Sequence, residues 1–274
     1  MIGILGHLGR LGSKLVSLGC DALDCDVTNL DQVTEAIESY RGHTVINCAA
    51  YTDVDGAETD AGYSIASKVN GLAPGRIKIL CDRYDKRLIH LSTDYVFSGK
   101  KGPYTEDNLP KDPVNKYGLT KFAGEYALRT FHTKNDITVR TTGLYGGSDR
   151  YDFLQLIKNS IGKGMPLSVS DELMGNQTHY NHLAEGLLVL ANTHPFPTRM
   201  IHIASEEVIS RFGFALLIAK KFGYSVELVL PVDNKDIVNW KAKRPSRGGL
   251  DVRLAKELGI PIYTIEEGLE LECQ

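Results

Sequence analysis

The sequence predicts an α/β fold, a doubly wound parallel sheet with a smaller C-terminal lobe, and three observations lead to this prediction. Short apolar runs alternate with amphipathic stretches in the first half of the chain, which is the pattern of repeated β-α-β units. The first apolar run leads directly into a glycine-rich turn over residues 6–12. Beyond about residue 151 the alternation is less regular, which indicates a second structural unit.

The expected strands and helices follow from the period of the apolar residues. Strands are predicted at the short apolar runs, residues 2–5, 44–48, 88–92 and 138–140. Helices are predicted where apolar residues recur at helical spacing, at residues 13–18, 30–40, 65–84, 153–161, 182–192 and 211–222. Asp26 or Thr28 is the expected N-cap of the second helix, and Ser64 that of the third. We expect residues 1–147, joined by about 177–205, to form a dinucleotide-binding domain, and residues 148–176 and 206–274 to form the smaller, substrate-binding lobe.

Composition and charge point to a small-molecule ligand. The chain has 274 residues, 42% of them apolar, which is enough for a sizeable core. Its 31 basic and 34 acidic residues give a net charge of -3, which favours neither nucleic acid nor an anionic membrane as a partner. The five cysteines, at positions 20, 25, 48, 81 and 273, lack a Cys-x-x-Cys or zinc-type spacing, so we expect thiols in the cytoplasm. The first residues contain neither a basic leader nor an apolar run of transmembrane length, so we expect neither export nor membrane insertion.

The glycine-rich turn has the composition of a Rossmann-type phosphate site. Gly6, Gly9 and Gly12 are spaced by three and follow the first strand directly. Glycines let the backbone approach a pyrophosphate, and the N–H groups at the start of the next helix face it. The candidate cofactor-binding residues here are Gly6, Leu8, Gly9, Arg10, Leu11 and Gly12. A tight strand-to-helix turn without a ligand is the alternative interpretation.

The residue that reads the adenosine ribose is ambiguous in this sequence. An acid about twenty residues further on is typical of NAD sites, whereas a basic residue is typical of NADP sites. Asp24 is placed to accept the ribose hydroxyls, and Asp26 with Val27 to flank the adenine. Arg10 offers a guanidinium for a 2′-phosphate, with a solvated arginine as the alternative. The cofactor is therefore predicted as NADPH or NADH, without a choice between them.

Tyr117 and Lys121 are the candidate catalytic pair. They are four residues apart, so on a helix they share one face. An ammonium near a phenol favours the phenolate and lowers the ordinary phenol pKa of about 10, so that the tyrosine can exchange a proton. This spacing alone is weak evidence, because thirteen tyrosines give roughly one such match by chance.

Two strand ends supply the rest of the predicted site. The apolar run over residues 88–92 ends in Ser92, Thr93 and Asp94, and ligands collect beyond the carboxyl ends of parallel strands. Thr93 is therefore the candidate donor to a substrate carbonyl, the alternative being that these hydroxyls only cap a turn. At another strand end, the small residues 48–50 would let a flat cofactor lie close to the backbone.

Together these motifs resemble those of the extended short-chain dehydrogenases, and within them the dTDP-4-dehydrorhamnose reductases. The likeness runs from the glycine turn through residues 47–58, 69–70, 92–97, 117–121 and 140–142 to 244–251. It implies a reductase in which Thr93 and Tyr117 hydrogen-bond the C4 carbonyl of a nucleotide-linked 4-keto-6-deoxy sugar, as in dTDP-L-rhamnose synthesis. Tyr117 would supply the proton, and Lys121 would position and polarise. Tyr117 and Lys121 are also candidate cofactor-binding residues, because the lysine can hold the nicotinamide ribose. The resemblance also implies cofactor contacts by Cys48, Ala49, Ala50, Tyr51 and Asn70, and substrate contacts by Val54 and Asp94.

The second half of the chain holds three further candidate positions. The family usually carries a tryptophan beside the sugar where this chain has Gly143, which leaves the identity of the sugar open. Arg244 is the candidate ligand for the diphosphate of a sugar nucleotide, because a guanidinium matches phosphate oxygens; a solvated arginine is the alternative. His179 and His182 are three residues apart, but no further Cys or His completes a site, so no metal is expected.

Three functions remain open on the sequence alone. The first is reduction of a nucleotide-linked keto sugar. The second is a non-catalytic regulatory subunit that keeps the dinucleotide fold, which the intact Thr93, Tyr117 and Lys121 argue against. The third is a sugar-nucleotide epimerase or dehydratase, in which the hydride returns to the product. The expected partner is a small nucleotide sugar, and a homodimer is left open as the oligomeric state.

Overall fold

The computed structural model describes residues 1–130, 133, 135–147, 152–237 and 240–273, and it confirms the predicted α/β class. Its main element is a sheet of six parallel strands in the order β2-β1-β3-β4-β5-β8. The strands are β1 (Ile2–Leu5), β2 (Asp21–Leu23), β3 (Thr44–Asn47), β4 (Arg87–Thr93), β5 (Asp136–Thr141) and β8 (Met200–His202). The winding direction reverses between β1 and β3, and this is where doubly wound folds bind their ligands.

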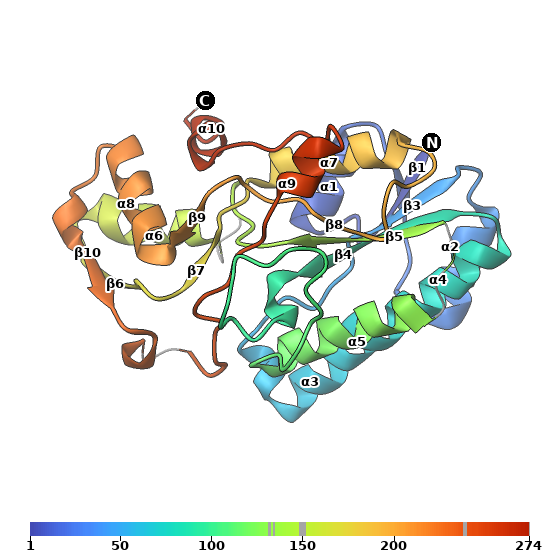
Figure 1. The fold of residues 1–274 in the computed structure, drawn as a ribbon, viewed down its shortest axis with the longest axis horizontal. Helices are drawn as coiled ribbons and strands as arrows, with labels where there is room; N and C mark the ends of the chain where they lie inside the picture. Colours follow the sequence, from blue (N-terminus) through green and yellow to red (C-terminus); the bar gives the residue numbers. More distant parts are fainter. Residues whose placement is uncertain (131–132, 134, 148–151, 238–239, 274) are drawn as a thin grey trace.

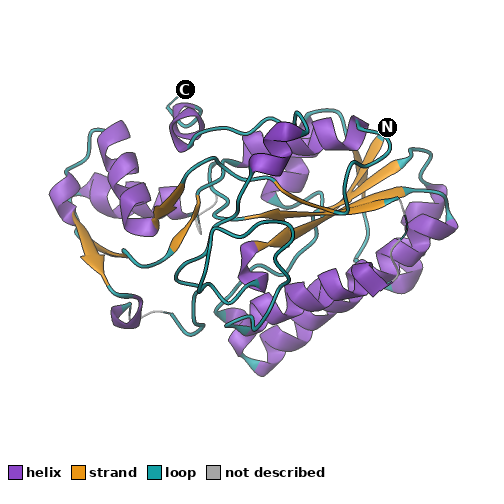
Figure 2. Ribbon diagram, in the orientation of Figure 1, coloured by secondary structure: helices purple, strands orange, loops and turns teal. Residues whose placement is uncertain are grey.

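Helices cover both faces of this sheet (Figure 1, Figure 2). One face carries α1 (Arg10–Ser17) and α7 (Tyr180–Asn192), and the other carries α2 (Leu30–Ser39), α4 (Ala73–Arg83) and α5 (Lys116–Thr130). Ile4 of β1 packs with the first pair, whereas its neighbour Leu5 packs with the second group. Because successive side chains of a strand point to opposite faces, β1 is apolar on both sides, as a buried parallel sheet requires.

The two predicted helix N-caps differ from the structure. Two helical segments precede α4 in the chain: α3 (Asp60–Ala66) and a π-helical turn (Ser67–Leu72). Asn29 caps α2, in place of the predicted Asp26 or Thr28, by accepting hydrogen bonds from two N–H groups of the first turn. Thr59 caps α3, in place of Ser64, so the predicted helix begins earlier. Several short polar side chains precede each helix, and the tertiary fold selects the one that caps.

A smaller lobe lies beside the main sheet (Figure 1). Its strands pair as β6 (Leu167–Ser170) with β10 (Val229–Val232) and β7 (Met174–Asn176) with β9 (Val208–Ser210), and its helices are α6 (Phe153–Ser160), α8 (Arg211–Lys221) and α10 (Ile265–Glu270). Phe214 is fully buried there, in a cluster with Leu154 and Ile157. The division of the chain into two domains stays a prediction, and one helix departs from it. Helix α9 (Arg253–Glu257), expected in the lobe, packs on the main sheet through Ala255.

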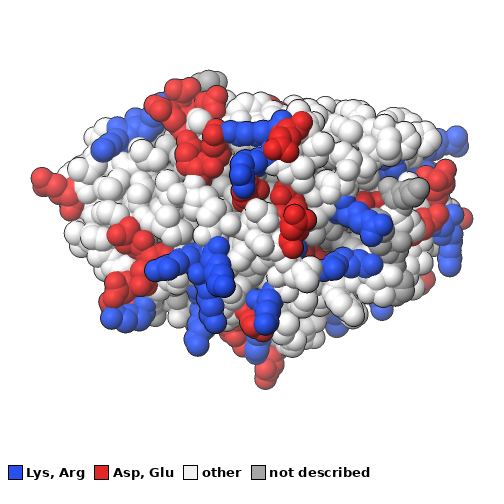
Figure 3. All heavy atoms as spheres, viewed as in Figure 1, with Lys and Arg blue, Asp and Glu red and all other residues white. Residues whose placement is uncertain are grey.

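Charged side chains of both signs alternate over the face of the molecule shown in Figure 3. Within the described ranges, no helix is both long and apolar enough to span a bilayer. All five cysteines are free thiols, in agreement with their spacing, and two of them, Cys20 and Cys81, are buried.

A buried ion pair attaches α5 to the sheet. Both carboxylate oxygens of Glu125 accept hydrogen bonds from the Arg140 guanidinium, at 2.9 and 2.7 Å, and the Ser92 hydroxyl donates to the same carboxylate at 2.6 Å. The side chains of Glu125 and Arg140 are 1% and 2% exposed. The two-pronged geometry satisfies both charged groups, whereas either group alone would be an uncompensated charge in the interior.

Replacing Glu125 by alanine is expected to destabilise the fold strongly, because Arg140 is then buried without its partner. Breaking a buried pair from one side typically lowers the free energy of unfolding by about 3–5 kcal/mol. Denaturant unfolding followed by circular dichroism measures the change. The matched control is Glu270→Ala in the exposed pair with Lys221, where we expect a loss below about 1 kcal/mol. Equal losses in the two variants would contradict the importance of the buried pair.

Candidate active site

The glycine turn after β1 is shaped to admit a phosphate group. Helix α1 begins at Arg10, earlier than predicted, so Gly12 lies in its first turn. A Cβ atom at Gly12 would lie 2.2 Å from the carbonyl oxygen of Gly6, so only glycine lets the helix start this close to β1. No side chain caps the helix, which leaves its first backbone N–H groups available for an anion. The residues present therefore fit a dinucleotide diphosphate.

Among the residues predicted for the adenosine half of the cofactor, Asp24 has the most open position. It follows β2, its side chain is 88% exposed, and its Oδ1 lies 3.9 Å from Nε2 of His7 in the glycine turn. Asp26 instead accepts hydrogen bonds from the N–H and the hydroxyl of Thr28, and Val27 is buried in the core. Asp24 therefore stays the candidate acceptor for the ribose hydroxyls, while Asp26 is occupied by its own turn.

Arg10 links the glycine turn to the smaller lobe. Its Nη1 donates to Oδ2 of the buried Asp152 at 2.6 Å, and the same nitrogen lies 3.4 Å from the carbonyl oxygen of Leu144. Both partners follow β5, which lies on the other side of β1 from β2. The interpretation of Arg10 as a solvated residue is therefore wrong. A contact with a 2′-phosphate near β2 would require this pair to break.

The tip of β3 forms a wall beside the glycine turn, and Asn70 fixes it in place. A Cβ atom at Gly6 would lie 2.6 Å from the nitrogen of Ala49, which shows how closely the two segments approach. Asn70, on the π-helical turn, is fully buried and binds the Tyr51 backbone through its Oδ1 at 2.9 Å and its Nδ2 at 3.0 Å. Its Nδ2 also donates to the Thr120 hydroxyl at 3.1 Å. Asn70 thus links the backbone at the end of residues 48–51 to α5.

Tyr117 lies in the first turn of α5, against the end of β4. Asn115 caps the helix by accepting a hydrogen bond from the Gly118 N–H at 2.7 Å. A Cβ atom at Gly118 would lie 2.2 Å from the carbonyl oxygen of Tyr95, so glycine permits the close approach of α5 to the turn after β4. The Tyr117 ring is 9% exposed and meets the Tyr95 ring edge-on, with 5.9 Å between centroids. This approach, in addition to the helical spacing, brings Tyr117 to Thr93.

Thr93 and Tyr117 form the centre of the candidate site. Burial raises the pKa of Tyr117 above its ordinary value, and the Thr93 side chain opposes that rise, so the lowering of the phenol pKa that the sequence predicts from Lys121 is not found. The phenol is therefore protonated at neutral pH, which is the form that gives a proton. The Thr93 hydroxyl also accepts a hydrogen bond from the Tyr95 N–H at 3.2 Å, so Thr93 caps its turn as well.

Lys121 lies one turn further along α5 and is buried. Its ammonium donates to the carbonyl oxygen of Leu91 in β4 at 2.7 Å. Burial lowers the pKa of Lys121 to about 8, and the nearby Glu125 and Cys48 oppose this shift. The lysine is therefore charged at neutral pH and is held between α5, β4 and the tip of β3.

Asp94 connects the end of β4 with the C-terminal loop. Its buried carboxylate is hydrogen-bonded by the hydroxyls of Thr93 and Thr142 and by the N–H of Gly249. Burial nevertheless raises the pKa of Asp94 to about 6. The three hydrogen bonds explain why the group is retained in the interior, since a buried carboxylate needs donors around it.

A cavity of about 130 Å³ opens beside Asp94 and Tyr95, and Gly143 borders it. Gly143 has a φ angle of +59°, and a Cβ atom there would lie 2.3 Å from the carbonyl oxygen of Asn176. The tryptophan that the family resemblance leads one to expect therefore does not fit this backbone. Other residues of the lining are Arg10, Thr142, Asp152, Phe153, Gln177 and Arg211.

Arg244 fastens the C-terminal loop to the segment after β3. Its guanidinium contacts both carboxylate oxygens of Asp55, at 2.6 and 3.2 Å, and its side chain is 8% exposed. The interpretation of Arg244 as a solvated residue is therefore wrong. Val54, next to Asp55, packs against the cluster that contains Tyr117, so the pair lies close to the candidate reaction centre. A contact of Arg244 with a substrate diphosphate stays a prediction.

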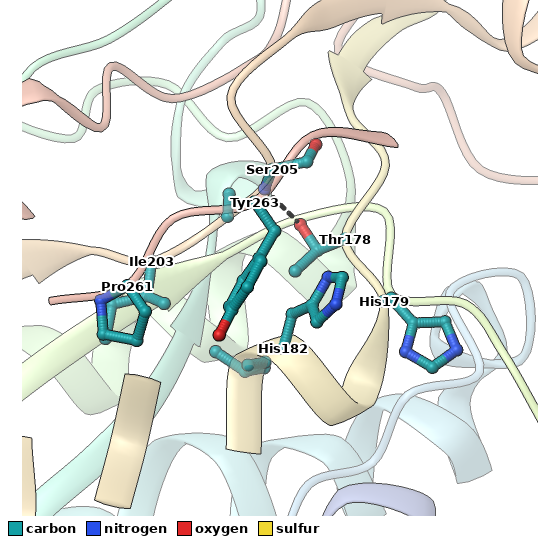
Figure 4. Close-up of a pocket in the computed structure, with 9 residues that line it drawn as sticks. Thr178, His179, His182, Ile203, Ser205, Pro261 and Tyr263 are labelled. Atoms are coloured by element: carbon teal, nitrogen blue, oxygen red, sulfur yellow. Dashed lines mark hydrogen bonds between the residues drawn. The ribbon is translucent and has the colours of Figure 1, made fainter. Parts of the chain in front are cut away.

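His179 and His182 have structural partners (Figure 4). His179 caps α7 by accepting a hydrogen bond from the Asn181 N–H at 3.2 Å, and its Nε2 lies 3.0 Å from a carboxylate oxygen of Glu272. His182 stacks on the Tyr263 ring, with 3.8 Å between centroids, beside a cavity of about 10 Å³, room for about one water molecule. In the part of the chain that the structure describes, no three side chains converge as metal ligands.

Three residues around the site escaped the sequence analysis. Glu125, the buried partner of Arg140, is four residues beyond Lys121, so the i, i+4 spacing that marked Tyr117 and Lys121 extends to it. Asp152 and Arg211 come from the smaller lobe, and no local pattern connects them with the end of β4.

Family membership follows from similarity over nearly the whole chain. The family model described as the RmlD substrate binding domain matches residues 2–273. The chain belongs to this family. The RmlD family comprises NAD(P)-dependent reductases of nucleotide sugars, and the predicted resemblance to dTDP-4-dehydrorhamnose reductases is confirmed.

Individual RmlD relatives differ in their named roles. The dTDP-4-dehydrorhamnose reductase of Mycobacterium tuberculosis (strain H37Rv) is 36% identical over 244 residues, which cover 84% of this chain and 78% of the relative. A probable low-salt glycan biosynthesis reductase of Haloferax volcanii, Agl14, is 31% identical over 271 residues, 96% of this chain and 88% of the relative. The crystal structure of a dTDP-4-dehydrorhamnose reductase from Bacillus anthracis in complex with NADP has a TM-score of 0.89 at 29% identity and covers 98% of this chain and 96% of that one.

The raised pKa of Asp94 is expected to make the stability of this protein depend on pH. Between about pH 4 and about pH 6 the folded state keeps a proton that the unfolded state loses, so the free energy of unfolding falls as the pH rises. The loss amounts to roughly 3 kcal/mol above pH 6, at about 1.4 kcal/mol per unit of pKa. The variant Asp94→Asn cannot ionise and should lack this loss. Denaturant unfolding of both proteins across this range tests it, and a constant difference between them would contradict the assignment.

Proposed function

We propose that this chain reduces the C4 keto group of a nucleotide-linked 4-keto-6-deoxy sugar, with NADPH or NADH as the reductant. The observation that carries the proposal is the buried, protonated Tyr117 phenol beside Thr93 at the carboxyl end of β4. A carbonyl oxygen placed between these two hydroxyls would accept a hydrogen bond from each. The names of the relatives, dTDP-4-dehydrorhamnose reductases among them, support this substrate class. The free thiols are in keeping with action in the cytoplasm.

The candidate residues of α5 and β4 would have different catalytic roles. Thr93 orients and polarises the carbonyl through its hydroxyl. Tyr117 gives its proton to the carbonyl oxygen as negative charge develops there, and the charge of Lys121 on the same helix face favours the resulting phenolate. A bound nicotinamide supplies the hydride that completes the alcohol.

The surrounding segments would hold the dinucleotide. The first turn of α1, with Gly12 at its closest approach to Gly6, would receive the diphosphate. Asn70 keeps the tip of β3 in position along the cofactor, and Asp24 would accept the ribose hydroxyls. These roles would bring the nicotinamide ring near Tyr117, because α5 and the tip of β3 are joined through Asn70 and Thr120.

A spectrophotometric screen tests the proposed function. The protein is mixed with NADPH or with NADH and a panel of nucleotide-linked 4-keto-6-deoxy sugars, and the loss of reduced-nicotinamide absorbance is followed. We expect oxidation with at least one substrate, with equal formation of the alcohol. No oxidation with any member of the panel would contradict the proposal. Turnover without net oxidation, with cofactor kept bound, would identify an epimerase or dehydratase instead.

Replacing Tyr117 by phenylalanine should remove the proton donor and leave the fold intact. We expect kcat to fall by about 10²- to 10⁴-fold, the usual contribution of a positioned acid, with little change in cofactor affinity. Tyr126→Phe is the matched control, because Tyr126 lies on the same helix and is largely exposed. Steady-state kinetics and cofactor titration measure both variants. An undiminished kcat in Tyr117→Phe would remove Tyr117 from the mechanism.

A further inference from the structure

Arg211 brings an unpaired positive charge to the cavity beside Asp94. It is the first residue of α8, and its side chain borders the cavity. Its guanidinium rests on the Phe153 ring, with 4.2 Å between the guanidinium carbon and the ring centroid. Among the described residues, this guanidinium forms neither a hydrogen bond nor an ion pair. A guanidinium has five N–H donors, so these N–H groups are available to solvent or to a ligand.

The other charges around the cavity have partners. Arg10 holds Asp152 at 2.6 Å, and Asp152 also accepts the N–H groups of Gly146 and Leu154. Asp94 is surrounded by the hydrogen bonds described above. Burial lowers the pKa of Arg211, which reflects the cost of a charge withdrawn from water. An anion in the cavity would compensate that charge.

The cavity adjoins the candidate reaction centre through Tyr95. Tyr95 lines it and meets the Tyr117 ring edge-on. Gly143 leaves the opposite wall without a side chain. Its volume of about 130 Å³ is well below the roughly 300–1,000 Å³ of pockets that enclose a whole small-molecule ligand, so it suits one charged substituent of a larger substrate.

We propose that Arg211 binds an anionic oxygen group of the substrate. A phosphoryl group at this position would select for nucleotide-linked sugars in general, whereas a sugar carboxylate would select for uronates in place of the 6-deoxy sugars proposed above. The planar guanidinium matches both groups through paired hydrogen bonds, and the Phe153 ring holds its plane. The identity of the substrate rests on the proposed function, whereas the anion site rests on the cavity and its unpaired charge.

Binding experiments on the full chain test this role without turnover. Calorimetric titrations use thymidine diphosphate as the phosphoryl probe, and UDP-glucuronate against UDP-glucose as the carboxylate probe. Arg211→Met removes the charge and keeps an unbranched side chain on Phe153, while Arg211→Lys keeps the charge. Lys220→Met, on the exposed side of the same helix, is the matched control. An NADP⁺ titration and thermal unfolding of each variant check that the fold and the cofactor site are intact.

If the phosphoryl group is the ligand, Arg211→Met weakens thymidine diphosphate binding by about tenfold to a hundredfold, the usual worth of hydrogen bonds to a charged group. If the carboxylate is the ligand, thymidine diphosphate binding is unchanged, and the preference for UDP-glucuronate over UDP-glucose is lost. In either case Arg211→Lys loses less, and Lys220→Met and NADP⁺ binding are unaffected.

The inference is overturned if Arg211→Met changes neither affinity by more than about twofold, or if the unaltered protein binds neither probe. These outcomes are separate from the fate of the proposed function. A protein that reduces no keto sugar but binds anions through Arg211 would contradict only the reductase proposal. A protein that reduces keto sugars with an unchanged KM in Arg211→Met would contradict only the role of Arg211.

Discussion

The ion pair between Glu125 and Arg140 is the constraint on which the candidate site depends. Glu125 is one helical turn beyond Lys121, and its third partner, Ser92, directly precedes Thr93. The pair therefore fixes the position of α5 relative to the sheet. It does so next to two candidate site residues, Lys121 on the helix and Thr93 on the strand. Proton transfer tolerates little misplacement, and a site built on a helix and a strand keeps its geometry better than one built on loops.

Two further ion pairs join the two parts of the chain near the carboxyl ends of the strands. Arg10 at the start of α1 holds Asp152 at the start of α6, and Arg244 in the C-terminal loop holds Asp55 after β3. Arg10 and Asp55 lie in or next to segments that would contact the dinucleotide. Their partners, Asp152 and Arg244, belong to the part of the chain predicted to bind the substrate. Binding of a diphosphate at α1 would therefore act on the same residue that positions α6. The two candidate ligand sites are therefore connected by side chains that are already paired.

Much of the fold could be predicted because it depends on local periodicity, whereas the partners of the charged residues could not. The apolar runs gave β1 with its observed bounds and α2, α6 and α8 to within a residue or two, and the rule of strand ends located Thr93 and Asp94. The pairings of Arg10 and Arg244 span 142 and 189 residues, beyond any local pattern. The N-caps and α9 were misassigned for the same reason, since tertiary packing selects among equivalent short polar or apolar stretches.

Gly143 shows how a single backbone conformation changes the lining of the cavity beside the candidate reaction centre. An aromatic wall at this position would contact the apolar face of a sugar ring, and such contacts discriminate poorly between sugars of similar shape. The left-handed conformation of Gly143 and the nearby Asn176 carbonyl exclude that wall, and the space is bordered instead by the Arg211 guanidinium. A partly buried charge disfavours a substrate that lacks a matching anionic group, because such a substrate leaves the charge without a partner. The candidate proton-transfer residues Thr93 and Tyr117 do not line this cavity, so the exchange leaves them in place.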